Sequence, residues 1–380
     1  MTKNQILGLF LIFWIFCTCS CLAADNAPTP RSAKGLVLEV QNTTKAAEKT
    51  DFIWQGGDQN YVEQALKVKI LSGADQGKVV EILNHSTASP LDILVAKGDK
   101  VFLYIENFGP QQKYFIRDFW HLDNLIFWLI VFLALVILLG KSQGCKALLA
   151  LALSLLLIFG IFIPLVVQGA SPLPLAVLIA FAVSCLTLPI IYGFSWQALI
   201  AILGTLGGIL TAVIFALFIN HFAHLTGLGA EDVRIFAVQN PNFNFQGLLL
   251  AGIILGALGA IMDVAVSIAA GLQEIKAHKP QISFKELVAS GLKIGRAILG
   301  SMLNTLVFAY VGASLIIILL VIQNQIGLLE FLNYGFVVEE IVRTLIGSIG
   351  LLATIPLTAL AAGFFYQHRA SSNAANYSQN

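Results

Sequence analysis

The sequence has 380 residues, of which 57% are hydrophobic and only 11% are charged, and its formal net charge is +1. Soluble domains average about 25% charged residues, so this composition excludes an ordinary soluble protein and predicts a chain that crosses a lipid bilayer many times. The near-neutral charge gives no reason to expect a nucleic-acid partner.

The first 24 residues are typical of a secretory signal peptide. Lys3 precedes an apolar run from Ile6 to Phe16, and the small residues Ala23 and Ala24 follow it. The alternative is an uncleaved anchor helix. Both interpretations place the segment that follows, residues 25–120, outside the cytoplasm.

Residues 25–120 form the polar part of the chain, and several short runs in it alternate between apolar and polar side chains. Leu66, Val68 and Ile70 share one face of such a run, with Lys67 and Lys69 on the other. A turn-rich segment at 72–77 follows and predicts a hairpin. We expect strands over 35–41, 65–71, 78–83, 91–95, 101–105 and 111–115. The segment is therefore predicted to be a small exported β-rich domain, a barrel or a sandwich, that serves as a structural module or binds a protein partner.

Seven apolar stretches follow, each long enough to cross about 30 Å of hydrocarbon. They cover residues 123–140, 147–167, 173–192, 197–219, 247–271, 298–322 and 344–366. The predicted fold is an all-α polytopic membrane bundle of about seven transmembrane helices over residues 121–369, preceded by the exported domain. Residues 370–380 are predicted to be a cytoplasmic tail.

The basic residues between the stretches predict an orientation. If residues 25–120 lie outside, the cytoplasmic side holds eight basic residues and the outer loops hold only two. The eight are Lys141, Lys146, Lys276, Lys279, Lys285, Lys293, Arg296 and Arg369, and the two are Arg234 and Arg343. This bias predicts a cytoplasmic C-terminus in the cell membrane.

Residues 283–294 precede the sixth stretch and begin with a capping box formed by Ser283 and Glu286. One interpretation is an amphipathic helix that lies at the inner membrane surface. The other is a plain N-terminal extension of the sixth stretch.

A single aspartate, Asp263, interrupts the fifth stretch near its middle. A carboxylate at the bilayer midplane costs roughly 2.5–3.5 kcal/mol on insertion scales, so its face must look into protein or a water-filled cavity. Helical spacing places seven small or polar residues on that face, namely Gly252, Gly256, Gly259, Asp263, Ser267, Gly271 and Glu274. We interpret Asp263, Ser267 and Glu274 as candidates to line an ion or substrate path, and Gly252, Gly256 and Gly259 as candidates for helix packing.

The last two stretches carry similar faces. Arg296, Gly300 and Asn304 are spaced four apart in the sixth, and Asn304 is a further path candidate because it needs a hydrogen-bonding partner. The seventh places Arg343, Gly347, Gly350, Thr354 and Thr358 on one face, for which close helix packing is the alternative to a functional role. Glu339 and Glu340 are close enough to Arg343 to form an ion pair with it.

Sequence signals for an enzyme are weak. His221 and His224 are three residues apart, and a zinc site would need two more ligands. HExxH, GxSxG and P-loop motifs are missing from the sequence. We therefore expect no catalytic residues, no metal and no cofactor.

Three long phrases resemble the YibE/F family of bacterial multi-spanning membrane proteins. They are LGALGAIMDVAVSIAAGLQEI at 255–275, GRAILGSMLNTLVFAYVG at 295–312 and EEIVRTLIGSIGLLATIPLTAL at 339–360. The resemblance implies an exported β-rich segment followed by about seven spans, with a permease-like role. It also implies an acidic residue directly after Arg296, where this chain has Ala297.

Two hypotheses follow. The first is a permease-like transporter of a small solute or ion that uses Asp263, and the alternative is a non-transporting sensor or assembly scaffold whose exported domain binds a partner. Flux of solute into sealed vesicles would discriminate between them.

Overall fold

A computed structural model describes residues 31–45, 61–86, 93–108 and 111–377. The chain divides into two compact units, one that contains the strands and reaches Val136, and one that contains the helices from Ile137 onward. The predicted signal segment, residues 1–24, lies outside the described residues.

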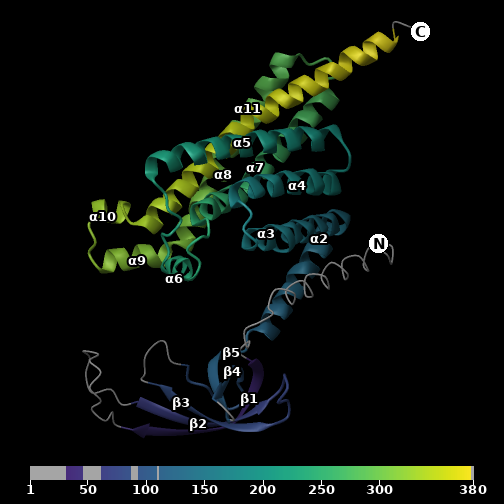
Figure 1. The fold of residues 1–380 in the computed structure, drawn as a ribbon. Coiled ribbons are helices and arrows are strands. Elements are labelled where there is room, and N and C mark those ends of the chain that lie inside the picture. The colour runs from purple at the N-terminus through teal and green to yellow at the C-terminus, as the bar shows by residue number, and fades with distance from the viewer. Residues whose placement is uncertain (1–30, 46–60, 87–92, 109–110, 378–380) are drawn as a thin grey trace. The chain divides into compact units, whose positions relative to one another are not determined.

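The first unit is a five-stranded antiparallel sheet in the order β3-β2-β1-β4-β5. The sheet curls into a half-barrel, and its edge strands β3 and β5 contact each other (Figure 1). The predicted alternation is confirmed, because Leu66, Val68 and Ile70 are buried whereas Lys67 and Lys69 are exposed. The strands are β1 (Arg31–Lys45), β2 (Tyr61–Ile70), β3 (Val79–Ser86), β4 (Lys100–Phe108) and β5 (Gln111–Phe119).

The predicted strand at 91–95 is wrong for its described part, residues 93–95, which pair with no strand. Side-chain amides hold this segment instead. Gln64 accepts a hydrogen bond from the Val95 nitrogen (3.1 Å) and donates one to the Val95 oxygen (3.2 Å). Asn84 donates to the Ile93 oxygen (2.7 Å). Because these amides satisfy the buried backbone, the apolar run needs no neighbouring strand.

A polar cluster ties the sheet to the first turn of helix α2 (Leu122–Leu157). One oxygen of Asp123 accepts hydrogen bonds from Lys34 (2.7 Å) and Lys100 (2.8 Å), and the other accepts one from the Trp120 indole (2.9 Å). Lys34 also lies 5.2 Å from the centre of the Trp120 ring. The start of α2 is therefore fixed to β1 and β4 by three charge-assisted bonds.

In the described part of the chain, six helical segments are long and apolar enough to cross a membrane. The longest, Leu122–Val167, contains the first two predicted stretches and is interrupted at Lys141, whose φ of 47° and ψ of −129° are not helical. Counted as two crossings, it gives the predicted seven. The helices after α2 are η1 (Ile158–Phe162), α3 (Ile163–Val167), α4 (Pro172–Tyr192), α5 (Trp196–Ala223), α6 (Glu231–Gln239), α7 (Phe245–His278), α8 (Phe284–Ala313), α9 (Leu315–Gln323), α10 (Leu328–Leu332) and α11 (Gly335–Tyr377).

Helix α8 corrects the boundaries of the sixth predicted stretch. The capping box of Ser283 and Glu286 starts it, and one continuous helix runs to Ala313, so residues 284–294 are an N-terminal extension rather than a separate surface helix. The remainder of the predicted stretch, from Leu315, belongs to α9. Gly291 and Gly295 allow the extension to pack closely against α11, because a side chain at either position would overlap Ala359 or Ile355.

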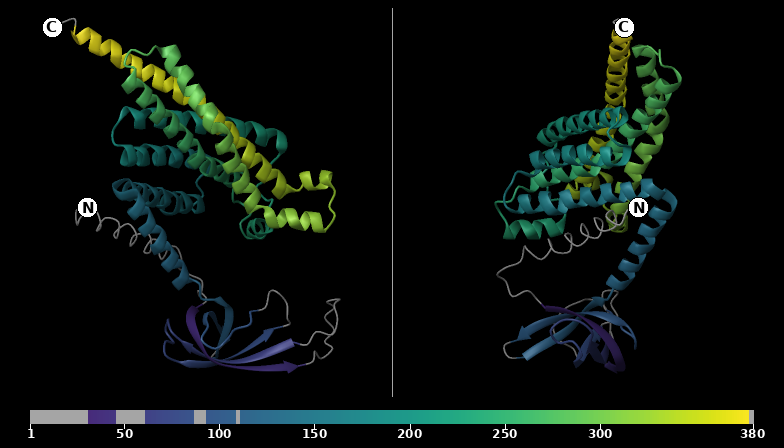
Figure 2. Two further views of the ribbon diagram at one scale, coloured as in Figure 1. Left: turned by 180° about the vertical axis from the view of Figure 1, so that it is seen from behind. Right: turned by 90° about the vertical axis from the view of Figure 1, so that its right-hand side faces the viewer.

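Helix α11 lies at the centre of the second unit, where it packs against α5, α7 and α8. Both views in Figure 2 keep α8 beside α11. The closest approach is between α5 and α11, where Gly204 and Gly208 lie against Thr358 and Thr354. A Cβ at Gly350 would lie 3.1 Å from the Gly208 carbonyl oxygen. We call this contact the closed crossing.

Candidate functional site

The candidate site is a row of small and polar residues on the uncovered face of α7. Asp263 lies near the middle of this helix and is exposed, whereas Ile261, Val264 and Ala265 beside it are fully buried. Gly256, Gly259, Ser267 and Glu274 are exposed on the same face. These five residues, Gly256, Gly259, Asp263, Ser267 and Glu274, are called the open strip. The described helices leave these five residues of the predicted face uncovered, whereas Gly252 and Gly271 at its ends are half-buried and Gly271 lies against Ile294 of α8.

The glycines of this face are not covered by a neighbouring helix backbone. A Cβ added at Gly259 would meet no atom within 4 Å, and the same holds for Gly300 on α8. At Gly256 the nearest atom would be the Tyr310 hydroxyl at 3.4 Å, and at Gly252 it would be a guanidinium nitrogen of Arg343 at 3.9 Å. The packing role predicted for Gly259 and Gly300 has no counterpart within the described chain.

Gly347 behaves differently. A Cβ at this position would lie 3.5 Å from Ala257 on α7 and 3.8 Å from Leu306 on α8. Gly347 therefore lies where α7, α8 and α11 meet. The closed crossing with α5 lies further along α11.

The polar residues of α8 lie at the depth of Asp263. Gly271 of α7 faces Ile294, and Gly256 faces Tyr310, so the two helices run antiparallel and Asn304 falls near the level of Asp263. Asn304 is exposed. Within the described residues, the side chains of Asp263, Ser267 and Asn304 make no hydrogen bond to protein, so all three have unused hydrogen-bonding capacity.

Arg296 does not neutralise Asp263. It is exposed on α8, and among the described residues it has no ion-pair partner, either in Asp263 or elsewhere. The position after it, Ala297, offers no charge. Asp263 is thus a carboxylate without a counter-charge in this part of the chain.

Tyr192, the last residue of α4, is the polar group that the sequence analysis missed near Asp263. Its hydroxyl lies within electrostatic range of the Asp263 carboxylate. Nothing in the spacing of the sequence could have paired residues of the third and fifth stretches. Their proximity follows from the packing of α4 on α7.

A charged cluster lies at the end of the same face that is nearest Gly252. Arg343 Nε lies 3.3 Å from Glu340 Oε1, as predicted for that pair. Glu339 is buried and accepts a hydrogen bond from the Gly229 nitrogen (3.1 Å), so its main bond is to the loop after α5. Tyr310 lies within electrostatic range of Arg343 and Glu340. At the other end, Glu274 pairs with His278 (3.1 Å), and both are exposed.

These groups are better suited to a proton or a monovalent cation than to a multivalent metal ion such as zinc or calcium. A lone carboxylate flanked by hydroxyl and amide side chains offers oxygen ligands but too few for a structural metal site. The described residues contain no group of three or more His, Cys, Asp or Glu that could hold a metal ion.

Comparison with known families divides the chain between residues 119 and 128, a few residues before the boundary of the two structural units at Val136. A family model described as YibE/F-like protein matches residues 128–368, and one described as YibE/F family N-terminal domain matches residues 31–119. The first match covers the helices, and the second covers the five strands. No curated protein and no solved structure matches the chain.

Proposed function

The chain belongs to the YibE/F-like family and is an integral membrane protein, and from this premise we propose that it is a permease-like transporter that moves a small solute or ion past Asp263. The observation that carries the proposal is the uncovered carboxylate in the middle of α7. A charge at this depth is costly when it faces lipid, so the open strip borders water or another protein.

The residues beside Asp263 suit a path. Gly259 and Gly300 leave space next to the carboxylate, and Ser267 and Asn304 offer hydrogen bonds that no described protein group uses. A cation gives up its hydration water more readily where protein oxygen atoms can replace it. The side chains of the open strip would supply such oxygen atoms. In the proposed orientation the strip runs from the Arg343 cluster outside to Glu274 inside.

Flux measurements in sealed vesicles test this function. The full chain is reconstituted, and uptake of H⁺, Na⁺ and K⁺ is followed with ion-sensitive dyes for wild type, Asp263→Asn and the matched control Glu330→Gln, an exposed carboxylate on α10 outside the open strip. We expect flux of one of these cations that Asp263→Asn abolishes and Glu330→Gln leaves within twofold. Wild-type flux no greater than in empty vesicles, or full flux in Asp263→Asn, would refute the role of Asp263.

A second function, a sensor or assembly scaffold, draws support from the sheet. Its edge strands expose Val79 and Leu83 on β3 and Phe115 and Phe119 on β5. The Asp123 cluster would pass a movement of the sheet to the start of α2. Under this function a cellular phenotype survives Asp263→Asn but is lost in Leu83→Lys, the reverse of the transporter pattern.

A further inference from the structure

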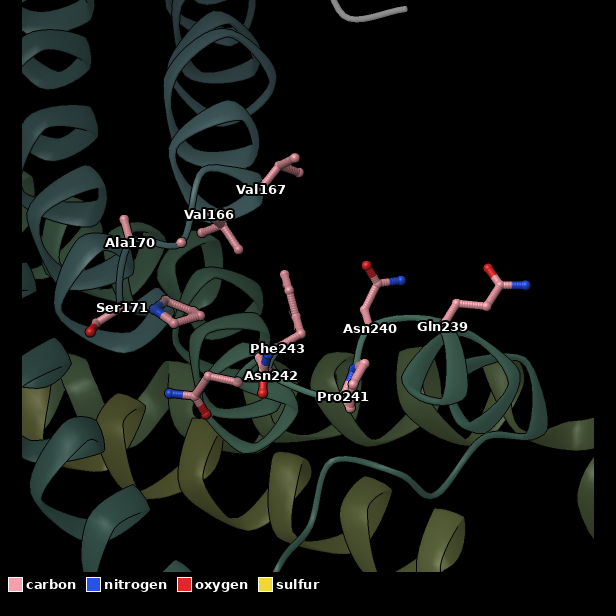
Figure 3. A pocket seen from close by; sticks show the side chains of 12 residues that line it. Val166, Val167, Ala170, Ser171, Gln239, Asn240, Pro241, Asn242 and Phe243 are labelled. Carbon is pink, nitrogen blue, oxygen red and sulfur yellow. The ribbon is translucent and has the colours of Figure 1, made fainter. Parts of the chain in front are cut away.

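A cavity of about 400 Å³ lies apart from the open strip, where two connections of the helical unit meet (Figure 3). One is the turn from α3 to α4, and the other is the segment from α6 to α7, residues 239–244. The second contributes four carboxamide side chains, Gln239, Asn240, Asn242 and Asn244. We call this cavity the amide pocket.

The carboxamides have unused hydrogen-bonding capacity. Asn242 is exposed and makes no hydrogen bond within the described residues, so its donor and its acceptor are both available. The Asn240 nitrogen donates to the Phe236 oxygen (3.2 Å), which leaves its carbonyl oxygen as an acceptor. The Asn244 oxygen accepts from the Gly247 nitrogen (2.7 Å), which leaves its NH₂ as a donor. The pocket thus offers donors and acceptors side by side.

The electrostatics of the pocket favour a neutral ligand. Its described lining contains no Asp, Glu, Lys, Arg or His. The helices α4 and α7 both begin here, and their positive N-terminal ends disfavour a cation. An anion would need free backbone donors, but Pro172 and Pro174 have none, and the Asn244 side chain already caps α7.

The opposite side of the pocket is apolar. Val166 and Val167 face the ring of Phe243, and in Figure 3 Asn240 stands beside that ring whereas Gln239 extends away from it. Phe243 is held in place by Phe236 and Phe245, at ring-centre distances of 5.8 and 5.0 Å. An aromatic and aliphatic wall next to carboxamides suits a molecule with hydroxyl groups on one side and C–H groups on the other.

We propose that the amide pocket binds a neutral polyhydroxylated molecule of sugar or polyol type. Its volume falls in the range of small-molecule sites, about 300–1,000 Å³. The proposal does not depend on transport past Asp263, because binding at this pocket involves none of the residues of the open strip.

Calorimetric titration of the full chain tests the proposal. The protein is placed in lipid nanodiscs free of sugar-based detergent and titrated with glucose, with glucosamine as a cationic analogue and with gluconate as an anionic one. We expect saturable binding of glucose that is at least tenfold tighter than binding of either analogue. Asn242→Ala should weaken glucose binding about tenfold, since it removes a donor and an acceptor.

The matched control is Gln323→Ala, which removes an exposed carboxamide from α9, outside the pocket. It should bind glucose like wild type, and both variants should unfold at the wild-type temperature. Failure of glucose to bind saturably, equal affinity in Asn242→Ala, or equal affinity for a charged analogue would each overturn the proposal. No flux is measured, so failure here leaves the transporter proposal standing.

Discussion

The closed crossing and the open strip are built from the same kinds of residue, and their surroundings are opposite. At the crossing, Gly204 and Gly208 of α5 lie directly against Thr358 and Thr354 of α11. On the strip, Gly259 has open space beside it and Asp263 has no partner among the described residues. Small residues at helical spacing thus serve two purposes in one bundle. At the closed crossing, the small residues face threonines whose hydroxyl groups bond to their own helix, and the two backbones come close together. On the open strip, the small residues precede a lone carboxylate, and space is left beside them.

The largest expected difference between the two regions is in the loss of stability when a glycine of each is replaced by leucine. Gly208→Leu would force a side chain into Thr354 and Ile261, whereas Gly259→Leu would enter open space. We expect Gly208→Leu to destabilise the protein by about 3 kcal/mol or more, and Gly259→Leu to stay within about 0.5 kcal/mol of wild type. Thermal unfolding of both variants in detergent measures this. Equal destabilisation would mean that a neighbour covers Gly259.

The end of this face near Gly252 carries a different contact, the hydrogen bond that the Gly229 nitrogen donates to Glu339. Glu339→Ala leaves the half-buried Gly229 nitrogen without its acceptor and removes a buried side chain, at a cost of about 1–3 kcal/mol. Glu340→Ala removes only the partner of Arg343 and should cost less, about 1 kcal/mol. Hydrogen exchange at residues 227–229 reports the difference. Slow exchange of this loop in Glu339→Ala would show that Glu339 does not hold it.

The smallest expected effect is a dependence of the stability of the sheet on pH. The Asp75 carboxylate raises the pKa of Lys78, and burial, followed by Asp75, raises the pKa of Tyr114. A raised folded pKa stabilises the protein below the unfolded value and is lost as the pH rises through the folded value. The sheet should therefore weaken slightly above about pH 10.

Asp75→Asn is the control for that pH effect, since it removes the carboxylate that both groups share. It should flatten the alkaline slope of the unfolding midpoint. An unchanged slope would assign the effect to groups elsewhere. A change in flux below pH 8 then cannot arise from Lys78 or Tyr114.

The sequence was sufficient for most of the strands and apolar helices and for the spacing of the face on α7, but not for what lies opposite that face. Period-two alternation located Leu66, Val68 and Ile70 correctly, and helical spacing placed Asp263 and Gly259 together. Whether a helix covers a glycine depends on tertiary packing, so Gly259 and Gly208 look alike in the sequence. The strand predicted at 91–95 was wrong for a related reason. The side-chain amide of Gln64 bonds the Val95 backbone in place of a neighbouring strand, and the alternation of apolar and polar residues carries no information about such a bond.

Water access to the strip tests the central claim most directly. In a chain with all five cysteines, Cys17, Cys19, Cys21, Cys145 and Cys185, replaced by serine, Ser267→Cys on the strip and Ser184→Cys, fully buried on α4, are exposed to a membrane-impermeant thiol reagent in vesicles. If the strip lines a water-filled path, Ser267→Cys is labelled, and Asp263→Asn leaves that labelling intact while it abolishes flux. Ser184→Cys stays unlabelled. Protection of Ser267→Cys to the same degree as Ser184→Cys would contradict the account, because the strip would then face lipid or a protein neighbour and could not conduct.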